Sequence, residues 1–397
     1  MKWFIGNTPQ DVQLNSRLSI GAIIYVAVIA PCVFILQPGY VQGLVDYLNL
    51  TDVQAGYIAS REMLGLAITT IALNFTAHRF DWRKLTALFL IICAAGNFLS
   101  MSTSDYNTLL QLRLFTGLGS GGLMSLTFTM MGLTRHPDRN FGFIIAFVLT
   151  YGALGLWIMP TAFQTVGMAG VMMFFGVFCA SGLLFVRLLP ASGQQHAAAD
   201  HPATPAYALP VILLTLLAIL GYNTAIGIVW TYLFLIGMEA QITEQTVANV
   251  LFISQIIGIV GALGASVLQL QFGRTWPLFL GILGIAMGIY CLLGEIALFH
   301  YVLGVFLFNL LWNYTMPYYL GALADFEPTG KVVVMGISMQ ATGVALGPYL
   351  AATILARSNY DTVYMVATIL FTASAFLLLP GLRVLSAGSD TTRKGSG

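Results

Sequence analysis

Three ionisable residues lie inside long apolar stretches of the sequence. Arg61 and Glu62 are adjacent within 52–76, and Arg113 lies within 107–134. An ionisable side chain in a membrane helix costs free energy, so each is a functional candidate by default. Burial favours the protonated form of a carboxylate, whereas a nearby guanidinium favours the ionised form. These types and depths predict that Glu62 binds a proton, that Arg113 is the partner controlling it, and that Arg61 meets a bound solute.

A structural role is the alternative, in which Glu62 and Arg113 form a fixed ion pair that locks two helices together. Sequence neighbours on a helix point about 100° apart, so Arg61 and Glu62 cannot face the same partner. Two arginines against one glutamate leave one excess positive charge, which favours an anionic solute because Arg binds carboxylate and phosphate in planar bidentate geometry. If both arginines serve structure, a neutral or lipophilic solute fits instead.

The composition explains why these three charges stand out. Of the 397 residues, 58% are hydrophobic and only 8% are charged, against roughly 25% charged in a soluble domain. The net charge of +1 provides no basic surface for a nucleic acid partner, and the abundance of apolar residues excludes disorder. The chain is therefore expected to be an all-α integral membrane protein whose surroundings are the lipid bilayer.

The elements that must position these residues are predicted from the apolar runs, since about 20 apolar residues cross a bilayer. Twelve helices are expected, near 17–40, 52–76, 84–103, 107–134, 140–162, 168–189, 208–237, 243–270, 276–294, 297–323, 331–357 and 360–380. A polar stretch rich in Ala and Pro interrupts the series. The expected organisation is an N-terminal six-helix bundle (1–189), a cytoplasmic linker (190–207) and a C-terminal six-helix bundle with a short cytoplasmic tail (208–397).

The basic residues predict the orientation. Most of the 16 lysines and arginines fall on the side shared by the two termini and the linker: Lys2, Arg17, Arg79, Arg83, Lys84, Arg135, Arg139, Arg187, Arg274, Lys331, Arg383, Arg393 and Lys394. By the positive-inside rule both termini are cytoplasmic, which an even number of crossings requires. We expect a multi-pass protein of the plasma membrane, or of the inner membrane in a bacterium.

The two halves share landmarks at a single offset of 191 residues, which pairs Pro137 with Pro328, Gly152 with Gly343, and Arg83 with Arg274. The stretch Leu109-x-x-x-Arg113-Leu-Phe-Thr-Gly117-Leu-Gly119 is similar to the helix 4 pattern of the major facilitator superfamily (MFS). With twelve helices and a central linker, the whole chain resembles that superfamily. The resemblance implies two pseudo-symmetric six-helix bundles, alternating access and a solute site between the halves near mid-membrane.

The loop between the second and third predicted helices departs from the superfamily pattern. Its basic residues match, but the Asp and both Gly of the pattern are replaced in residues 74–84. If the gating latch that the resemblance implies exists here, it must be rewired. The candidate gating residues are Arg79, Asp81, Arg83 and Asp138.

Polar residues in the apolar helices are further candidates for solute binding. They are Gln37 in the first predicted helix, Tyr222 and Asn223 in the seventh, Asn309, Asn313, Tyr314 and Tyr318 in the tenth, and Gln340 in the eleventh. Each of these residues could instead be a hydrogen-bonding contact between helices or, for the tyrosines, a residue of the interfacial belt. The cysteines, Cys32, Cys93, Cys179 and Cys291, lie far apart in apolar runs and are expected to be packing residues.

The sequence contains no phosphate-binding loop, zinc spacing or nucleophile triad. We therefore expect no enzyme activity, no cofactor and no metal, and transport driven by a gradient. The favoured function is that of a monomeric secondary active transporter, a symporter that moves a small organic anion together with protons. The alternatives are a proton-antiport exporter of drugs or lipophilic compounds and, from another class, a membrane channel or receptor.

Overall fold

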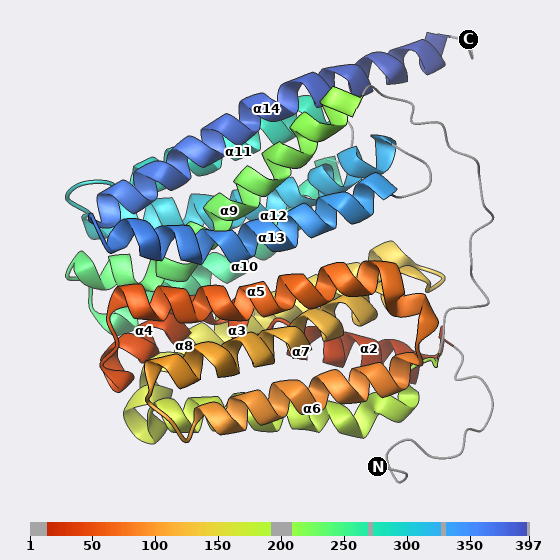
Figure 1. Cartoon of the computed structure of the whole chain (residues 1–397). Coiled ribbons are helices and arrows are strands. Elements are labelled where there is room, and N and C mark those ends of the chain that lie inside the picture. The colour runs from red at the N-terminus through yellow and green to blue at the C-terminus, as the bar shows by residue number, and fades with distance from the viewer. Residues whose placement is uncertain (1–13, 192–208, 269–272, 327–330, 395–397) are drawn as a thin grey trace. The chain divides into compact units, whose positions relative to one another are not determined.

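Each long apolar stretch is helical in the computed structural model, which describes residues 14–191, 209–268, 273–326 and 331–394 (Figure 1). The described residues contain no strand. The α-helices are α2 (Arg17–Ile29), α3 (Cys32–Ile35), α4 (Gln37–Leu48), α5 (Asp52–Thr76), α6 (Trp82–Ser100), α7 (Tyr106–Gly132), α8 (Pro137–Ser181), α9 (Leu209–Glu239), α10 (Glu244–Leu268), α11 (Thr275–Tyr290), α12 (Leu298–Phe326), α13 (Lys331–Leu355) and α14 (Tyr360–Lys394), with 3₁₀ helices η1 (Ala77–Arg79) and η2 (Gly182–Leu188).

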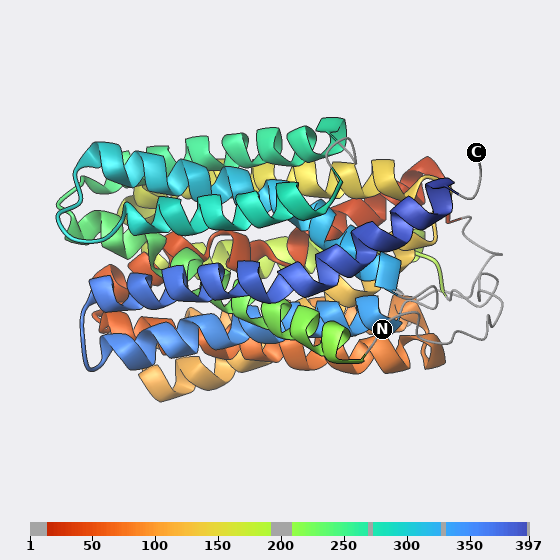
Figure 2. The ribbon, with the colours of Figure 1, turned by 90° about the horizontal axis from the view of Figure 1, so that it is seen from above.

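The chain divides into two compact units, Met1–Ala198 and Ala199–Gly397. Within each unit the helices run roughly along a common direction, as both views show (Figure 2). In the first unit α7 packs on α5 and α6, and in the second α12 packs on α10 and α11. Because α5, α6 and α7 occupy the same places in the chain order as α10, α11 and α12, the two units repeat one packing pattern. The all-α, two-bundle fold expected from the sequence is confirmed. The predicted linker 190–207 lies almost entirely outside the described residues.

Within the described residues, six stretches are long and apolar enough to cross a membrane by length and hydropathy alone. They are Trp82–Ser100, Arg139–Leu188, Leu209–Glu239, Glu244–Ala265, Val332–Leu355 and Tyr360–Arg383. Two shorter apolar helices, Arg17–Ile29 and Thr275–Tyr290, accompany them. The helices α5 and α7, which carry Arg61, Glu62 and Arg113, are not among the six, although they have 25 and 27 residues.

The first predicted helix, 17–40, is broken into three pieces and extends further, to Leu48. The first break comes at Pro31, which has φ −92° and ψ 18°, and the second at Leu36, directly before the next piece and Pro38. A proline has no N–H to donate and clashes with the preceding turn, so both breaks lie where the sequence interrupts the helical ladder. The breaks place Cys32 in the short α3 and Tyr40 in α4.

The fifth and sixth predicted helices are joined in α8, which is kinked rather than interrupted by a loop. At the kink Gly167 has φ 65° and ψ −177°. Glycine reaches this conformation without steric cost, whereas a side chain would strain it. The end of the sixth predicted helix is the 3₁₀ helix η2 instead of an α-helix.

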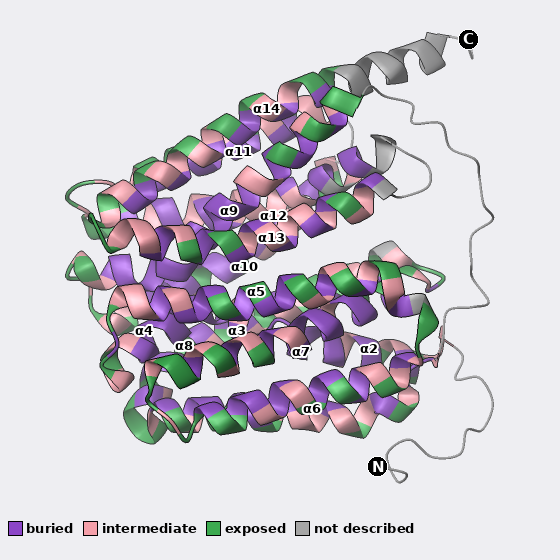
Figure 3. Cartoon of the chain, viewed as in Figure 1, coloured by how far each residue is buried: buried purple, intermediate pink, exposed green. Residues whose placement is uncertain are grey.

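Short polar side chains determine where the site-bearing helices begin. Thr51 accepts a hydrogen bond from the Gln54 backbone N–H at 3.2 Å, and the Gln54 side chain accepts one from Thr51 N, which completes a capping box for α5. Asp105 caps α7 by accepting from Thr108 N at 2.8 Å. Capping satisfies backbone donors that have no partner in the first turn of a helix. Buried residues recur along the whole length of both helices, among intermediate and exposed ones (Figure 3).

Candidate functional site

The site begins with the close approach of α5 to α7. A Cβ added to Gly117 would lie 2.0 Å from the backbone oxygen of Glu62, and one added to Gly121 would lie 2.2 Å from that of Leu66. A side chain at either position would therefore push the helices apart. Small residues at this spacing let two membrane helices pack backbone to backbone. This packing holds α5 against α7 independently of charge, and it places Glu62 beside Arg113.

Glu62 and Arg113 form a buried but loose ion pair. Arg113 Nη1 lies 3.8 Å from Glu62 Oε2, and the Arg113 side chain is 0% exposed and that of Glu62 3% exposed. A charge-assisted hydrogen bond is shorter, about 2.7–2.9 Å. The pair therefore attracts electrostatically without a direct hydrogen bond across this contact. These two residues were expected to lie within reach of each other because they have similar depths along their helices, and the structure brings them together.

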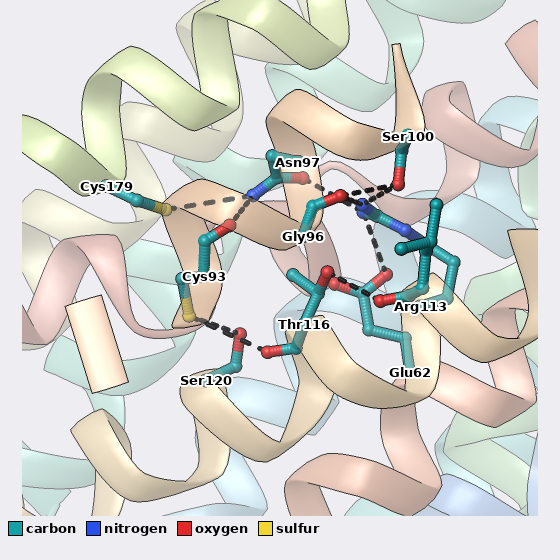
Figure 4. Close-up of polar contacts among 10 residues, drawn as sticks. Glu62, Cys93, Gly96, Asn97, Ser100, Arg113, Thr116, Ser120 and Cys179 are labelled. Carbon is teal, nitrogen blue, oxygen red and sulfur yellow. Dashed lines mark hydrogen bonds and ion pairs between the residues drawn. The ribbon is translucent and has the colours of Figure 1, made fainter. Parts of the chain in front are cut away.

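The hydrogen bonds of Arg113 go to α6 (Figure 4). Arg113 Nη1 donates to Asn97 Oδ1 at 2.9 Å, and Nη2 donates to Ser100 Oγ at 2.6 Å and to the Gly96 carbonyl at 3.0 Å. Three acceptors along one face of α6 therefore hold the guanidinium. The structural alternative raised from the sequence was an ion pair that locks the second and fourth predicted helices; that pair is present but loose, and the hydrogen bonds of Arg113 tie α7 to α6.

The Asn97 side chain links Arg113 to a cluster of thiols. Its Nδ2 donates to the Cys93 carbonyl at 2.9 Å and lies 3.8 Å from Cys179 Sγ (Figure 4). The Cys179 thiol in turn contacts the thiols of Cys32 and Cys93. The fold thus gathers three of the four cysteines, which come from α3, α6 and α8. These three cysteines are free and buried, which agrees with their predicted role as packing residues. No group of side chains able to hold a metal ion occurs within the described residues.

Tyr40 of α4 completes the site, although it was not among the residues predicted from the sequence. Its ring centroid lies 5.9 Å from Arg113 Cζ, within the range of a cation–π contact, and the residue is 1% exposed. The Tyr40 hydroxyl and Arg113 Nε have no hydrogen-bond partner among the described residues. Two unsatisfied polar groups in one buried place mark where a water molecule or a solute group can bind. The available sequence signal is the pair of prolines, Pro31 and Pro38, which break the first predicted helix just before Tyr40.

Asn97 and Ser100 were also missed. Both are buried polar residues within an otherwise apolar helix. That pattern is the available signal, since a buried amide in a membrane helix needs a partner. The sequence alone does not indicate which partner it has.

Arg61 is separate from the pair. Its side chain is exposed, and it interacts electrostatically with Tyr106 at the start of α7. The excess positive charge inferred from two arginines and one glutamate is therefore not concentrated at the buried pair. Whether Arg61 contacts a solute stays a prediction.

The candidate gating residues take up several local roles. Asp81 caps α6 by accepting from Arg83 N at 2.9 Å and Lys84 N at 3.2 Å. Arg83 Nε donates to the Leu189 carbonyl at 2.5 Å, which ties the start of α6 to the end of η2. Arg79 is exposed. The Asp138 side chain lies outside the described residues, so its gating role stays a prediction.

The polar candidates of the second unit form a separate set of contacts. The Tyr222 hydroxyl is 2.6 Å from Thr315 Oγ1, and Asn309 Nδ2 donates to Ser254 Oγ at 3.0 Å. Asn309 Oδ1 has no hydrogen-bond partner among the described residues. Two other candidates bond the preceding turn of their own helix, since Asn223 donates to Ile219 O and Asn313 to Asn309 O, both at 2.9 Å. The Tyr314 and Tyr318 rings are 5.3 Å apart, and the Tyr318 hydroxyl has no hydrogen-bond partner among the described residues. Gln340 Nε2 is 4.0 Å from Met316 Sδ. In the first unit, Gln37 is buried at the start of α4.

Solved structures that resemble this chain include transporters by their descriptions. The D-xylose-proton symporter superposes with a TM-score of 0.73 at 16% identity, covering 91% of this chain and 97% of that one. The nucleoside transporter NupG superposes with a TM-score of 0.73 at 12% identity, covering 91% and 99%. The inward-open xylose transporter XylE from E. coli gives 0.70 at 14% identity, covering 90% and 95%. At these identities the likeness shows the fold alone.

Sequence comparison identifies the family. The inner membrane metabolite transport protein YgcS of Escherichia coli (strain K12) is 25% identical over 118 residues, which are 28% of this chain and 26% of that relative. This match therefore spans about a quarter of the relative. The sequence profile of the Major Facilitator Superfamily matches residues 22–339. With that match over most of its length and the fold of the superfamily's transporters, the chain belongs to the Major Facilitator Superfamily of membrane transporters and is not an enzyme.

Proposed function

We propose that this transporter couples the movement of a small organic anion to protons, with Glu62 as the proton-binding group. The observation that carries the proposal is the arrangement of Arg113, whose hydrogen bonds go to α6 while its Nη1 stays 3.8 Å from Glu62 Oε2. A carboxylate that is hydrogen-bonded to a guanidinium is held in its ionised form. A buried carboxylate with a looser contact can take up and release a proton in response to small movements of its partner.

The packing of α5 against α7 supports proton binding over a purely structural pair. Gly117 and Gly121 already bring the two backbones into contact, so the helices do not need an ion pair to hold them together. A buried pair is also weak evidence for stability, because removing two charges from water costs about as much as their attraction returns. A buried Glu62 is therefore better explained by a role in binding and releasing a proton than by a contribution to stability.

The charges of Glu62 and Arg113 also favour an anionic cargo. When Glu62 takes up a proton, the charge of Arg113 is no longer compensated, and its Nε and the Tyr40 hydroxyl are without partners among the described residues. A carboxylate or similar anion would restore neutrality and accept these hydrogen bonds. One proton and one anionic charge would then travel together. Arg61, Gln37, Tyr222, Asn223, Asn309, Asn313, Tyr314, Tyr318 and Gln340 are proposed as further contacts for the cargo.

A neutral polar solute is the second candidate, and the second unit provides the observation that favours it. The unpartnered Asn309 Oδ1 lies on the same helix as Phe308 and Trp312, whose rings are 5.5 Å apart, and Trp230 packs on both. Amides beside aromatic faces suit hydroxyl-rich or heterocyclic solutes. The solved transporters named above carry xylose or nucleosides by their descriptions, which agrees with this alternative.

The test uses purified protein in liposomes that contain a pH-sensitive dye. Gluconate, glycerate and malate cross lipid slowly and serve as anions, while xylose and uridine serve as neutral solutes. For the wild type we expect acidification of the lumen when one of the anions is added outside. Glu62→Gln is expected to abolish the acidification while still exchanging labelled solute across the membrane. Protein-free liposomes and Asn140→Leu, a change at a buried residue whose Nδ2 donates to Thr134 Oγ1 at 2.9 Å, are the controls.

The outcomes separate the parts of the proposal. Proton movement that persists in Glu62→Gln would refute Glu62 as the proton-binding group. Acidification only with xylose or uridine would refute the anion and favour the neutral cargo. Solute movement without any proton flux in the wild type would refute coupling altogether.

The orientation and assembly are proposed on the sequence arguments. We infer that both termini are cytoplasmic and that the transporter acts as a monomer. Residues 190–207 are proposed as the linker between the bundles. The proposed gating residues of the transporter are Arg79, Asp81, Arg83 and Asp138. A fluorescent protein fused to the C-terminus fluoresces in the bacterial cytoplasm and stays dark in the periplasm after export by the general secretory pathway. A dark fusion would refute the orientation.

A further inference from the structure

Asn97 lies between Arg113 and the Cys93 carbonyl and bonds to both. Proton binding by Glu62 does not by itself require an amide at this position. We propose that Asn97 is a positioning residue that sets how strongly Glu62 holds its proton, by keeping the Arg113 guanidinium on α6. This inference rests on the proposed function, since it concerns the same carboxylate. It adds a residue on a third helix to the control of that group.

The orientation of the Asn97 amide is determined by its surroundings. Nδ2 donates to the Cys93 carbonyl at 2.9 Å and points to Cys179 Sγ at 3.8 Å. Both neighbours are acceptors for this NH₂ group, so the opposite orientation would set the amide NH₂ against the donors of Arg113. Oδ1 is therefore left facing Arg113, where it accepts from Nη1 at 2.9 Å (Figure 4).

One nitrogen is shared between Asn97 and Glu62. Arg113 Nη1 lies 2.9 Å from Asn97 Oδ1 and 3.8 Å from Glu62 Oε2. Nη1 is an NH₂ group with two hydrogens, so the two oxygens compete for the position of this nitrogen and not for one hydrogen, and Asn97 holds the shorter contact. Without the Asn97 oxygen, Nη1 would have Glu62 as its nearest acceptor, and a small rotation of the guanidinium would turn the loose pair into a charge-assisted hydrogen bond. That bond favours the ionised carboxylate.

The other titratable groups around the pair do not compete for this role. Tyr40 of α4 lies against the Arg113 guanidinium, and Cys32 of α3 and Cys179 of α8 interact with Arg113 electrostatically. From α6 itself come Asn97, Ser100, the Gly96 carbonyl and Cys93. Phenols and thiols are neutral at neutral pH, so Glu62 and Arg113 are the charged members of this group of described residues. A change at Asn97 reaches Glu62 through Arg113.

The experiment measures the protonation of Glu62 directly and needs no cargo. Infrared titration of the purified protein in lipid follows the carbonyl stretch of protonated carboxyl groups, and the band that disappears in Glu62→Gln belongs to Glu62. Asn97→Leu removes the competing oxygen, so the pH of half-protonation should fall by about one unit or more. Asn97→Asp places a carboxylate on Arg113 and leaves Glu62 without its partner, so that pH should rise by a similar amount.

Opposite shifts are the signature that a purely structural role of Asn97 would not produce. Asn140→Leu and Asn140→Asp, made at the buried asparagine that bonds Thr134, are the matched controls and should leave the Glu62 band unmoved. No shift in either Asn97 variant, or shifts in the same direction, would overturn the inference. If Asn97→Leu does not fold, Asn97→Asp still decides, because an unshifted or lowered pH of half-protonation refutes it.

The failure of this inference is distinguishable from the failure of the proposed function. Unshifted Asn97 variants beside a Glu62→Gln protein that has lost coupled transport would refute the positioning role alone. Shifted Asn97 variants beside a Glu62→Gln protein that still moves protons would leave the positioning role intact and refute the coupling role of Glu62.

Discussion

Replacement of Gly117 by alanine tests whether glycine packing, and not the ion pair, holds α5 to α7. The added Cβ would lie 2.0 Å from the Glu62 backbone oxygen and 2.8 Å from the Glu62 carbonyl carbon. Both neighbouring atoms belong to the backbone, so no side chain can rotate away to relieve the clash. The helices must separate locally, or the contact must be lost.

The size of the effect follows from this distance. An ordinary carbon–oxygen contact is about 3.3–3.6 Å, so α5 and α7 must move apart by more than 1 Å. Overpacking of a well-packed core costs roughly 1–3 kcal/mol, and occasionally more. Alanine is a better helix former than glycine by about 1 kcal/mol, which partly offsets this cost. Because the clashing atoms are backbone and cannot move aside, the overpacking cost should lie at the upper end of that range, about 2–3 kcal/mol. The net destabilisation is then about 1–2 kcal/mol, which corresponds to a fall in Tm of several degrees for a unit of this size.

The assay uses the buried thiols of the protein itself. Cys32, Cys93 and Cys179 are buried, so a thiol-reactive dye becomes fluorescent as the first unit unfolds on heating. Gly132→Ala is the matched control on the same helix, because a Cβ at Gly132 meets nothing within 4 Å. Its Tm should be unchanged or slightly raised. Glu62→Gln, measured beside them, should lower the Tm less than Gly117→Ala does.

A Gly117→Ala protein as stable as the wild type would refute the argument from backbone contact. A Glu62→Gln protein that loses more stability than Gly117→Ala would show that neutralising the buried Arg113 charge contributes more to stability than the glycine contact, which favours the structural alternative raised from the sequence.

Two further predictions concern charged side chains. Arg113→Lys keeps the charge, but a single ammonium cannot reach Asn97, Ser100 and the Gly96 carbonyl as the guanidinium does. We expect a loss of about 2–3 kcal/mol of stability, measured in detergent, and a fall of about tenfold or more in solute exchange, measured in liposomes. A variant unchanged in both would show that only the charge matters. Hydrogen bonds from the Thr108 hydroxyl and backbone lower the pKa of Asp105 below its ordinary value of 3.8, so the cap of α7 stabilises the fold above that value and is lost as pH falls through the lower folded-state pKa. The Tm difference between wild type and Asp105→Ala, followed by tryptophan fluorescence, should therefore be constant near neutrality and disappear in strong acid, and a difference that grows on acidification would contradict the assignment.

The fold was predictable from local sequence because lipid imposes a simple rule. Backbone groups have no water to bond in the bilayer core, so each apolar run becomes a helix, and the bounds of α5, 52–76, match the structure. The misplaced boundaries occur where backbone geometry intervenes. Pro31 and the segment around Pro38 break the first helix, and Gly167 bends two predicted helices into one element through its positive φ.

The candidate site was predictable only in part. Glu62 and Arg113 were evident because an ionisable residue in an apolar run is costly, and similar depths along two helices place them within reach. Asn97, Ser100 and Tyr40 were not identified, because a polar residue in a membrane helix has many possible partners. Rotation about the helix axis and the packing of neighbouring helices choose among those partners, and neither is encoded in the spacing along one helix.

The sequence by itself therefore determined that the chain is helical, spans a membrane and carries one acidic and two basic side chains within the apolar helices of its first half. The tertiary structure decided that Arg61 is exposed while Glu62 and Arg113 are buried, and it decided how Arg113 is used. The glycine contacts between α5 and α7 place Arg113 beside Glu62, while Asn97 and Ser100 of α6 take its hydrogen bonds. The physical reason is that the attraction between two charges depends on the distance between them and on the other groups that compete for their hydrogen bonds, and only the folded bundle sets both.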